Sequence, residues 1–359
     1  MIQGHVFDAV LSSQVKAHPL YYVLDFFHGF VAPAFFFSSG IAYGVSTIRR
    51  WDEQIIWGTA NRQRVCRYLL LIAVGYALHL PYFSLRKTLS SALPAEMNSL
   101  LQSDALQCIG VTLLLLQFSA FLLKRKNIFI GCAAIAGTAI VFSAPLIWSM
   151  KFAGRLPVWF APYLNSETSS WFPLFPWSEY ILGGVMFGYV FANAHGYRLA
   201  TSLMWKNLVL SLGMIGVAWF VSRLPFDVYP AHDFWKSNPT MFIIRLSSVS
   251  ILTSLVFLAE QSIESLPRIP LIIGKETFFI YILHLIIVYG SVINRGLAQW
   301  VGPTLSIFQS IGVFALVFVA IGLITILWHE WNSQHKLAAA YLQWGGAAIF
   351  LLAFVIRPW

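Results

Sequence analysis

Residues 105–123 read ALQCIGVTLLLLQFSAFLL and residues 127–149 read NIFIGCAAIAGTAIVFSAPLIWS, with only Lys124, Arg125 and Lys126 between them. Each run has roughly the 20 mostly apolar residues that a helix needs to cross a bilayer. Neither run contains a charged side chain. The stretch therefore predicts two membrane-spanning helices joined by a short basic turn.

The composition extends this interpretation to the rest of the 359 residues. Hydrophobic residues make up 58% of the chain and charged residues only 10%, whereas a soluble domain carries about 25% charged residues. We therefore expect an all-α, polytopic transmembrane bundle that forms one domain over residues 1–359, with the lipid bilayer as its surroundings. About ten apolar runs qualify as spans, at roughly 20–45, 67–85, 105–123, 127–149, 173–194, 205–223, 241–259, 273–293, 304–328 and 338–356.

The first residues, MIQGHVFDAVL at 1–11, form an apolar stub that lacks the basic flank and full length of a first span. We expect a partial helix here, the outer end of a span whose beginning is truncated.

The placement of Lys and Arg predicts the orientation, because cytoplasmic loops carry an excess of these residues. Arg49, Arg50, Arg62 and Arg64 fall in the connection 46–66, and three more basic residues fill 124–126. We place both connections in the cytoplasm, which puts 150–172, 224–240 and the C-terminus outside. The formal charge of +9 is thereby assigned to loops of a bacterial plasma-membrane protein, and no nucleic-acid partner is expected.

The three cysteines, Cys66, Cys108 and Cys132, have no metal-ligand spacing. They are typical of buried or free thiols. No zinc or haem motif is present, so no metal is expected.

Polar and ionisable residues interrupt several of the apolar runs. Such groups are costly inside a membrane and usually face a cavity or one another. In the predicted orientation all of them fall in the outer half of the bundle, and we expect His5, Asp25, His28, Gln107 and His284 to line one cavity there. The others at this depth are Asp8, His79, Asp104, Glu179 and Arg245.

Each of these residues also has a structural interpretation. A histidine on an apolar span can be a hydrogen-bonded packing residue, Asp104 can cap the helix that follows it, and Arg245 can extend to the headgroups or neutralise a carboxylate. Asp25 and His28 are three residues apart and share a helix face, a spacing that suits a carboxylate orienting an imidazole base.

Two other features lie near these residues. In HGFVAPAFFFSSG at 28–40, Pro33 is expected to kink its helix, and Gly40 and Gly44 allow a close helix approach. The outer connections 150–172 and 224–240 are rich in aromatic residues, which fit either an interfacial belt or a lid that stacks on a sugar.

Five segments in order resemble one family: QGHVFDA at 3–9, HGFVAPAFFFSSG at 28–40, DALQCIGV at 104–111, FPLFPWSEYILGGVMFG at 172–188 and GKETFFIYILHL at 274–285. Together they resemble the heparan-alpha-glucosaminide N-acetyltransferase catalytic-domain family of membrane acyltransferases. The resemblance implies a bundle of about eleven spans. It also implies that an acetyl group passes from cytoplasmic acetyl-CoA to a glycan or other amine or hydroxyl acceptor on the outer side.

The resemblance also implies a catalytic histidine between the first helix and the segment around Pro33. His28 is the first choice as base or transient acyl carrier, His18 the second and His5 the third, with Asp25 or Asp8 to orient the imidazole. Arg49, Arg50, Arg62 and Arg64 would hold the phosphates of acetyl-CoA. The residues expected to bind substrate are Asp104, Gln107, Trp177, Glu179, Arg245 and His284.

Two other functional classes stay open at this point. A transporter or flippase could use an intramembrane relay of Asp, His and Glu, although no internal repeat is evident. A degenerate, inactive membrane protein is the third interpretation, because of the stub at 1–11. A homodimer is also left open.

Overall fold

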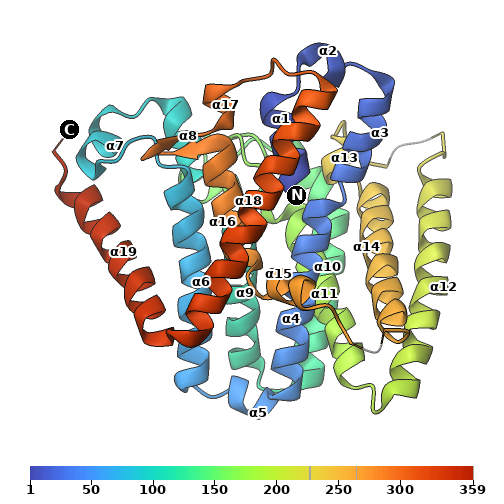
Figure 1. The fold of residues 1–359 in the computed structure, drawn as a ribbon. Coiled ribbons are helices and arrows are strands. Elements are labelled where there is room, and N and C mark those ends of the chain that lie inside the picture. Colours follow the sequence, from blue (N-terminus) through green and yellow to red (C-terminus); the bar gives the residue numbers. More distant parts are fainter. Residues whose placement is uncertain (226–227, 264, 359) are drawn as a thin grey trace. The chain divides into compact units, whose positions relative to one another are not determined.

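The computed structural model describes residues 1–225, 228–263 and 265–358. Almost all regular structure in this part of the chain is helical (Figure 1), as the apolar runs predict. Contacts between Cα atoms divide the chain into two compact units. The first contains residues 1–29, 78–97 and 263–359, and the second contains residues 30–77 and 98–262.

The second unit is built around the helices α4 and α11, which pack closely along their length. α10 packs on α11, and α12 packs on α14 through Asn207, whose amide Nδ2 donates to the hydroxyls of Ser250 and Ser254 at 2.9 Å each. The long helices of this unit are α4 (Val31–Arg49), α6 (Thr59–Leu78), α9 (Ala105–Leu123), α10 (Lys126–Ser149), α11 (Leu174–Ala192), α12 (Tyr197–Val221) and α14 (Pro239–Glu260). Its short elements are α5 (Trp51–Gln54), η1 (Ala161–Tyr163) and α13 (Phe234–Ser237).

Glycines bring α4 and α11 together. Gly40 and Gly44 of α4 face Gly184 and Gly188 of α11, and a Cβ atom added to Gly184 would overlap the carbonyl of Phe37. Small residues at four-residue spacing let the backbones of membrane helices touch, so the prediction of a close approach at Gly40 and Gly44 is confirmed.

Pro33 does not kink a helix as predicted. It is the third residue of α4, in the first helical turn, where a missing N–H costs no hydrogen bond. The chain instead breaks just before, at Gly29 and Phe30, between α3 (Pro19–His28) and α4.

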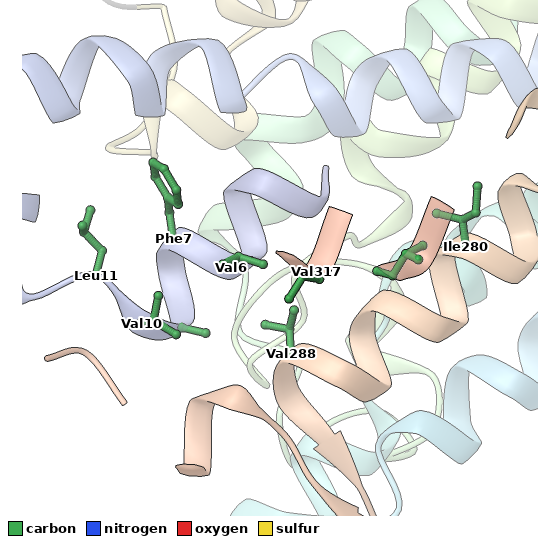
Figure 2. Close-up of a cluster of buried hydrophobic side chains, with 9 residues drawn as sticks. Val6, Phe7, Val10, Leu11, Ile280, Val288 and Val317 are labelled. Atoms are coloured by element: carbon green, nitrogen blue, oxygen red, sulfur yellow. The ribbon is translucent and has the colours of Figure 1, made fainter. Parts of the chain in front are cut away.

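The first unit is organised around α1 (Ile2–Val10), which packs against α16 (Thr277–Tyr289) and α18 (Ile307–Gln334). Val6, Val288 and Val317 converge from these three helices in a buried apolar cluster (Figure 2). Backbone hydrogen bonds also tie the end of α1 to the segment before α18, from Leu305 to Val10 at 2.9 Å and from Ser12 to Leu305 at 3.0 Å. The stub at 1–11 is therefore a folded, packed part of this unit. The unit also contains α2 (Ser13–Lys16), α3, α7 (Leu85–Ser91), α15 (Arg268–Lys275), β1 (Gly290–Ser291), β2 (Asn294–Arg295), α17 (Leu297–Trp300) and α19 (Lys336–Ile356).

Both ends of α16 are fixed by hydrogen bonds within this unit. At its start the chain bends by 75° between α15 and α16, and Glu276 at the bend contacts Nδ1 of His329 on α18 at 2.7 Å. At its end the amide of Gln299 donates to the carbonyl of Tyr289 at 2.7 Å.

Within the described residues, seven helical segments are long and apolar enough to cross a membrane, with α3 and α4 taken together as the segment Pro19–Arg49, or eight if the bent pair α15 and α16 is one span. About ten spans were predicted. The runs predicted at 67–85 and 173–194 do form helices of sufficient length, α6 and α11, but neither is among the helices apolar enough to qualify. α6 begins among the arginines of the 46–66 connection, and α11 carries Glu179.

Two predicted loops contain helices. Residues 84–104 form α7 and also α8 (Pro94–Leu101), which crosses the boundary between the units. The predicted outer connection 224–240 contains α13, while its residues 226 and 227 lie outside the described part of the chain.

Candidate functional site

The first unit brings two predicted residues, His5 and Asp8, onto one face of α1, one helical turn apart. Tyr289, at the end of α16, joins them. Its hydroxyl lies 3.0 Å from Nδ1 of His5 and donates to Oδ2 of Asp8, also at 3.0 Å. Asp8 is held in turn by Lys16, whose Nζ lies 3.3 Å from Oδ1. The result is a continuous hydrogen-bonded chain from Lys16 to His5.

This chain determines which nitrogen of His5 carries its proton. An ionised carboxylate only accepts hydrogen bonds, so the single hydroxyl proton of Tyr289 points to Asp8. The Tyr289 oxygen must then accept from Nδ1 of His5. In its neutral form His5 therefore has a proton on Nδ1 and a basic lone pair on Nε2.

His284 lies beside His5, with their ring centres 5.1 Å apart. It is fully buried, and its Nδ1 contacts the carbonyl oxygen of Ile280 at 2.9 Å. Two histidines predicted for the site, from opposite ends of the sequence, are thus neighbours in the structure.

His28, the first-choice base from sequence, lies against α1 at a different point. Its Nε2 is 2.9 Å from the side-chain oxygen of Gln3, and its ring lies over Gly4. Its Nδ1 is 4.0 Å from the carboxylate of Asp25, beyond hydrogen-bonding distance. Asp25 and His28 share a helix face as predicted, but they do not form the hydrogen bond that would fix the tautomer.

His18, the second choice, caps a helix. It is exposed, and its Nδ1 accepts from the backbone N–H of Leu20 at the start of α3 at 3.3 Å. This contact uses the ring nitrogen in local structure.

The residues predicted to bind substrate, apart from His284, belong to the second unit. Asp104 caps α9, with its Oδ1 accepting from the N–H of Ala105 at 2.7 Å, which confirms its structural interpretation. Arg245 donates to the carbonyl of Trp235 at 2.5 Å. Trp177 packs edge-on against Phe172, with ring centres 4.6 Å apart.

Two further side chains of this unit are set against glycines of neighbouring helices. The fully buried amide of Gln107 lies over Gly75 of α6, and the carboxylate of Glu179 lies over Gly137 of α10. Within the described residues, some buried side-chain atoms have no hydrogen-bond partner; among them are atoms of Gln107, Trp177, Glu179, Arg245 and His284. Such atoms are rare in folded proteins and often mark a bound water or ligand.

The predicted donor-binding arginines differ in their surroundings. Arg49, Arg50 and Arg62 are exposed. Arg64 donates to the hydroxyls of Thr47 and Ser46 at 2.8 and 2.9 Å. The first three side chains are therefore accessible to an anion, while Arg64 braces α6 against α4.

Sequence reasoning missed Tyr289, Lys16 and Gln3. Tyr289 ends an apolar run, where a tyrosine is typical of the membrane interface, so nothing in the sequence distinguished it from an interfacial aromatic residue.

All three cysteines are free. Among residues 1–225, 228–263 and 265–358, no group of three or more His, Cys, Asp or Glu side chains could hold a metal ion.

Comparison with known proteins adds one result. Residues 1–225 match the family model described as heparan-alpha-glucosaminide N-acetyltransferase, catalytic. No curated protein and no solved structure matches the chain. The matched residues are more than half of the sequence and include α1 with His5 and Asp8. The chain therefore belongs to the heparan-alpha-glucosaminide N-acetyltransferase catalytic family.

Proposed function

We propose that this membrane protein transfers an acetyl group from acetyl-CoA, bound from the cytoplasmic side, to an amine or hydroxyl of a glycan or related acceptor on the outer side. We further propose that His5 is the general base. Membership of an acetyltransferase family supports the reaction class. The hydrogen-bonded chain Asp8–Tyr289–His5 carries the choice of base.

Acyl transfer needs a group that removes a proton from the attacking amine or hydroxyl. Nε2 of His5 suits this role because Tyr289 holds the proton on Nδ1. When Nε2 takes up a proton, the imidazolium is stabilised through Tyr289 by the Asp8 carboxylate. An acid–base residue of this kind is commonly oriented by a third group in the same way.

His28 and His18 are weaker candidates because the hydrogen bonds of these rings lead to a side-chain amide and to a backbone N–H, whereas that of His5 leads through Tyr289 to a carboxylate. His28 contacts Gln3, and its carboxylate neighbour lies 4.0 Å away. His18 caps α3. Our proposal therefore moves the catalytic role from His28, the first choice from sequence, to His5.

The donor would use the exposed arginines of the second unit. Arg49, Arg50 and Arg62 present guanidinium groups to solvent, and guanidinium binds phosphate strongly through paired hydrogen bonds. These side chains support a site for the phosphates of acetyl-CoA.

The test measures acetyl transfer from radiolabelled acetyl-CoA to glucosamine and to membrane glycans by the purified protein in lipid nanodiscs. Asparagine at position 5 keeps an N–H for Tyr289 but removes the basic Nε2. Loss of a general base costs about 10²–10⁴-fold in rate, so His5→Asn should lower kcat by that factor. His28→Asn and His18→Asn should each lose less than about tenfold, below that range.

Asparagine is itself a favourable helix cap, so His18→Asn serves as the matched, correctly folded control. Near-normal transfer by His5→Asn together with an inactive His28→Asn would return the base to His28.

A further inference from the structure

One buried asparagine holds the turn that contains α5 and joins α4 to α6 (Figure 1). Asn61 lies in the first turn of α6 and is 1% exposed. Its Nδ2 donates to the carbonyl oxygens of Glu53 at 3.3 Å, Gln54 at 2.8 Å and Ile56 at 2.6 Å. These carbonyls lie at the end of α5 and just beyond it, where a helix leaves its last C=O groups without partners. The Asn61 side chain therefore caps the end of α5.

A glutamine on α9 joins this cap to the rest of the second unit. Nε2 of Gln117, which is also buried, donates to the carbonyl of Gln54 at 3.1 Å and to Oδ1 of Asn61 at 3.2 Å. In the same turn the buried ring of Trp51 packs on Phe129 of α10, with ring centres 5.3 Å apart. The turn is thus attached to α6, α9 and α10, and these contacts fix its path.

The side chains of three exposed arginines flank this turn, with Arg49 and Arg50 before it and Arg62 after it. Two exposed carboxylates, those of Asp52 and Glu53, lie between them in the sequence. Within the described residues, no ion pair joins either carboxylate to any of the three arginines. A guanidinium without a carboxylate partner is available for a phosphate. The path of the turn therefore determines whether these arginines meet phosphates or the acidic side chains beside them.

The buried network itself is poorly suited to a phosphate. Nδ2 of Asn61 and Nε2 of Gln117 already donate to oxygen atoms. In the part of the chain that the structure describes, the buried side-chain atoms of the network without a partner are Oε1 of Gln54 and Oε1 of Gln117. Both accept hydrogen bonds, as phosphate oxygens do. An effect of this network on donor binding must therefore act through the arginines.

We propose that Asn61 is a positioning residue of the donor site, which holds the turn in the path that leaves Arg49, Arg50 and Arg62 available for the phosphates of acetyl-CoA. This inference rests on the proposed function, which assigns those arginines to the donor. Without the Asn61 amide, the carbonyls at the end of α5 lose their donor and must find other partners. The turn then changes its path, and the guanidinium groups are no longer kept apart from the neighbouring carboxylates.

The test measures the binding of radiolabelled CoA to the purified protein in lipid nanodiscs. Asn61→Ala should raise the Kd for CoA at least about tenfold, the effect of losing one hydrogen bond to a charged group. Asn207→Ala is the matched control, because Nδ2 of Asn207 also makes three contacts within the second unit, to the carbonyl and hydroxyl of Ser250 and the hydroxyl of Ser254. Asn207 lies on α12, so this control should bind CoA like the parent. Because only binding is measured, a wrong choice of His5 as base does not affect the result.

Two further measurements separate positioning from a loss of stability. In the transfer assay, Asn61→Ala should raise the KM for acetyl-CoA but leave kcat and the KM for acetyl-pantetheine, a donor without phosphates, unchanged. A protein that is only destabilised would instead lose active molecules, which lowers kcat for both donors. Gln117→Met keeps a side chain of similar size on α9 and removes the hydrogen bonds to Gln54 and Asn61. It should raise the Kd for CoA by a smaller factor, and it decides the question if Asn61→Ala does not fold.

The possible results lead to different conclusions. If Arg49→Gln, Arg50→Gln and Arg62→Gln combined in one protein leave the Kd for CoA unchanged, the proposed donor site is wrong and this inference is overturned with it. If that protein binds CoA weakly while Asn61→Ala binds it like the parent, only this inference is overturned. Equal weakening by Asn61→Ala and Asn207→Ala would also overturn it, because the effect would then be one of stability.

Discussion

At the residue scale, Glu167 holds the aromatic connection 150–172 through hydrogen bonds to its backbone. Its carboxylate accepts from the N–H groups of Phe152 at 2.6 Å and Ala153 at 2.8 Å. The hydrogen bond from Ala153 has the largest effect on the Glu167 carboxyl, followed by the one from Phe152, and both lower its pKa. A carboxyl whose pKa is depressed in the folded state stabilises that state above the ordinary glutamate pKa of about 4.3, and this contribution is lost as pH falls through the lower, folded-state value.

Glu167→Gln should therefore loosen the 150–172 connection at neutral pH but not in acid. Hydrogen exchange gives the measurement, as protection factors for the Phe152 and Ala153 amides. Protection should be higher in the unsubstituted protein at pH 7, and the two proteins should converge at pH values below the folded-state pKa. Equal protection at pH 7 would contradict this role.

The residue scale is also where sequence reasoning reached its limit. The type of each side chain and its predicted depth in the membrane were enough to select His5, Asp8 and His284 as candidates, because ionisable groups stand out in apolar runs. Ranking the histidines needed partners far away in the chain: Tyr289 lies 284 residues from His5. The local pair Asp25 and His28 was visible in the sequence, and it was this visibility that made His28 the preferred base.

At the element scale, α4 and α11 depend on the absence of side chains at their crossing. A Cβ at Gly184 would overlap the Phe37 carbonyl and lie 3.0 Å from the Cα of Gly40. Backbone atoms cannot rotate away, so a larger residue must push the helices apart. Overpacking a core costs about 1–3 kcal/mol and occasionally more.

Gly184→Leu should therefore destabilise the protein markedly, read as a lower melting temperature in detergent. Gly213→Leu is the control, because a side chain at Gly213 on α12 would enter open space, and it should melt within a few degrees of the parent. Equal melting temperatures for the two variants would show that α4 and α11 can move apart at their crossing without loss of stability.

Helix positions followed from the sequence wherever an apolar run was bounded by charge. α9 and α10 match the predicted 105–123 and 127–149 almost residue for residue, because the three basic residues between them end one helix and start the next. The prediction was less accurate where polarity did not mark an end. α6 starts at Thr59, eight residues before the predicted span at 67, because polar residues such as Arg62 are as compatible with a helix as apolar ones.

At the scale of the whole molecule, orientation remains a prediction that labelling can test. In a protein whose three cysteines are replaced, Glu53→Cys reports on the 46–66 connection and Lys151→Cys on 150–172; both positions are exposed. An impermeant maleimide should label the position-151 variant in intact cells and the position-53 variant only after lysis, because the arginines of 46–66 favour a cytoplasmic location. The reverse pattern would invert the depth of every polar residue and remove the argument for an outer site.

The hydrogen bonds at the two ends of α16 have a consequence for the position of His284. The contact between Glu276 and His329 fixes the start of the helix, and the hydrogen bond from Gln299 to Tyr289 fixes its end. Together they oppose both translation of α16 along its axis and rotation about it. An α-helix turns by about 100° per residue. A slip of one residue at either anchor would therefore swing the imidazole of His284 away from that of His5. The distance between the two rings therefore depends on contacts at both ends of α16, and any event that loosens the Glu276 anchor would separate His284 from His5 without touching either ring.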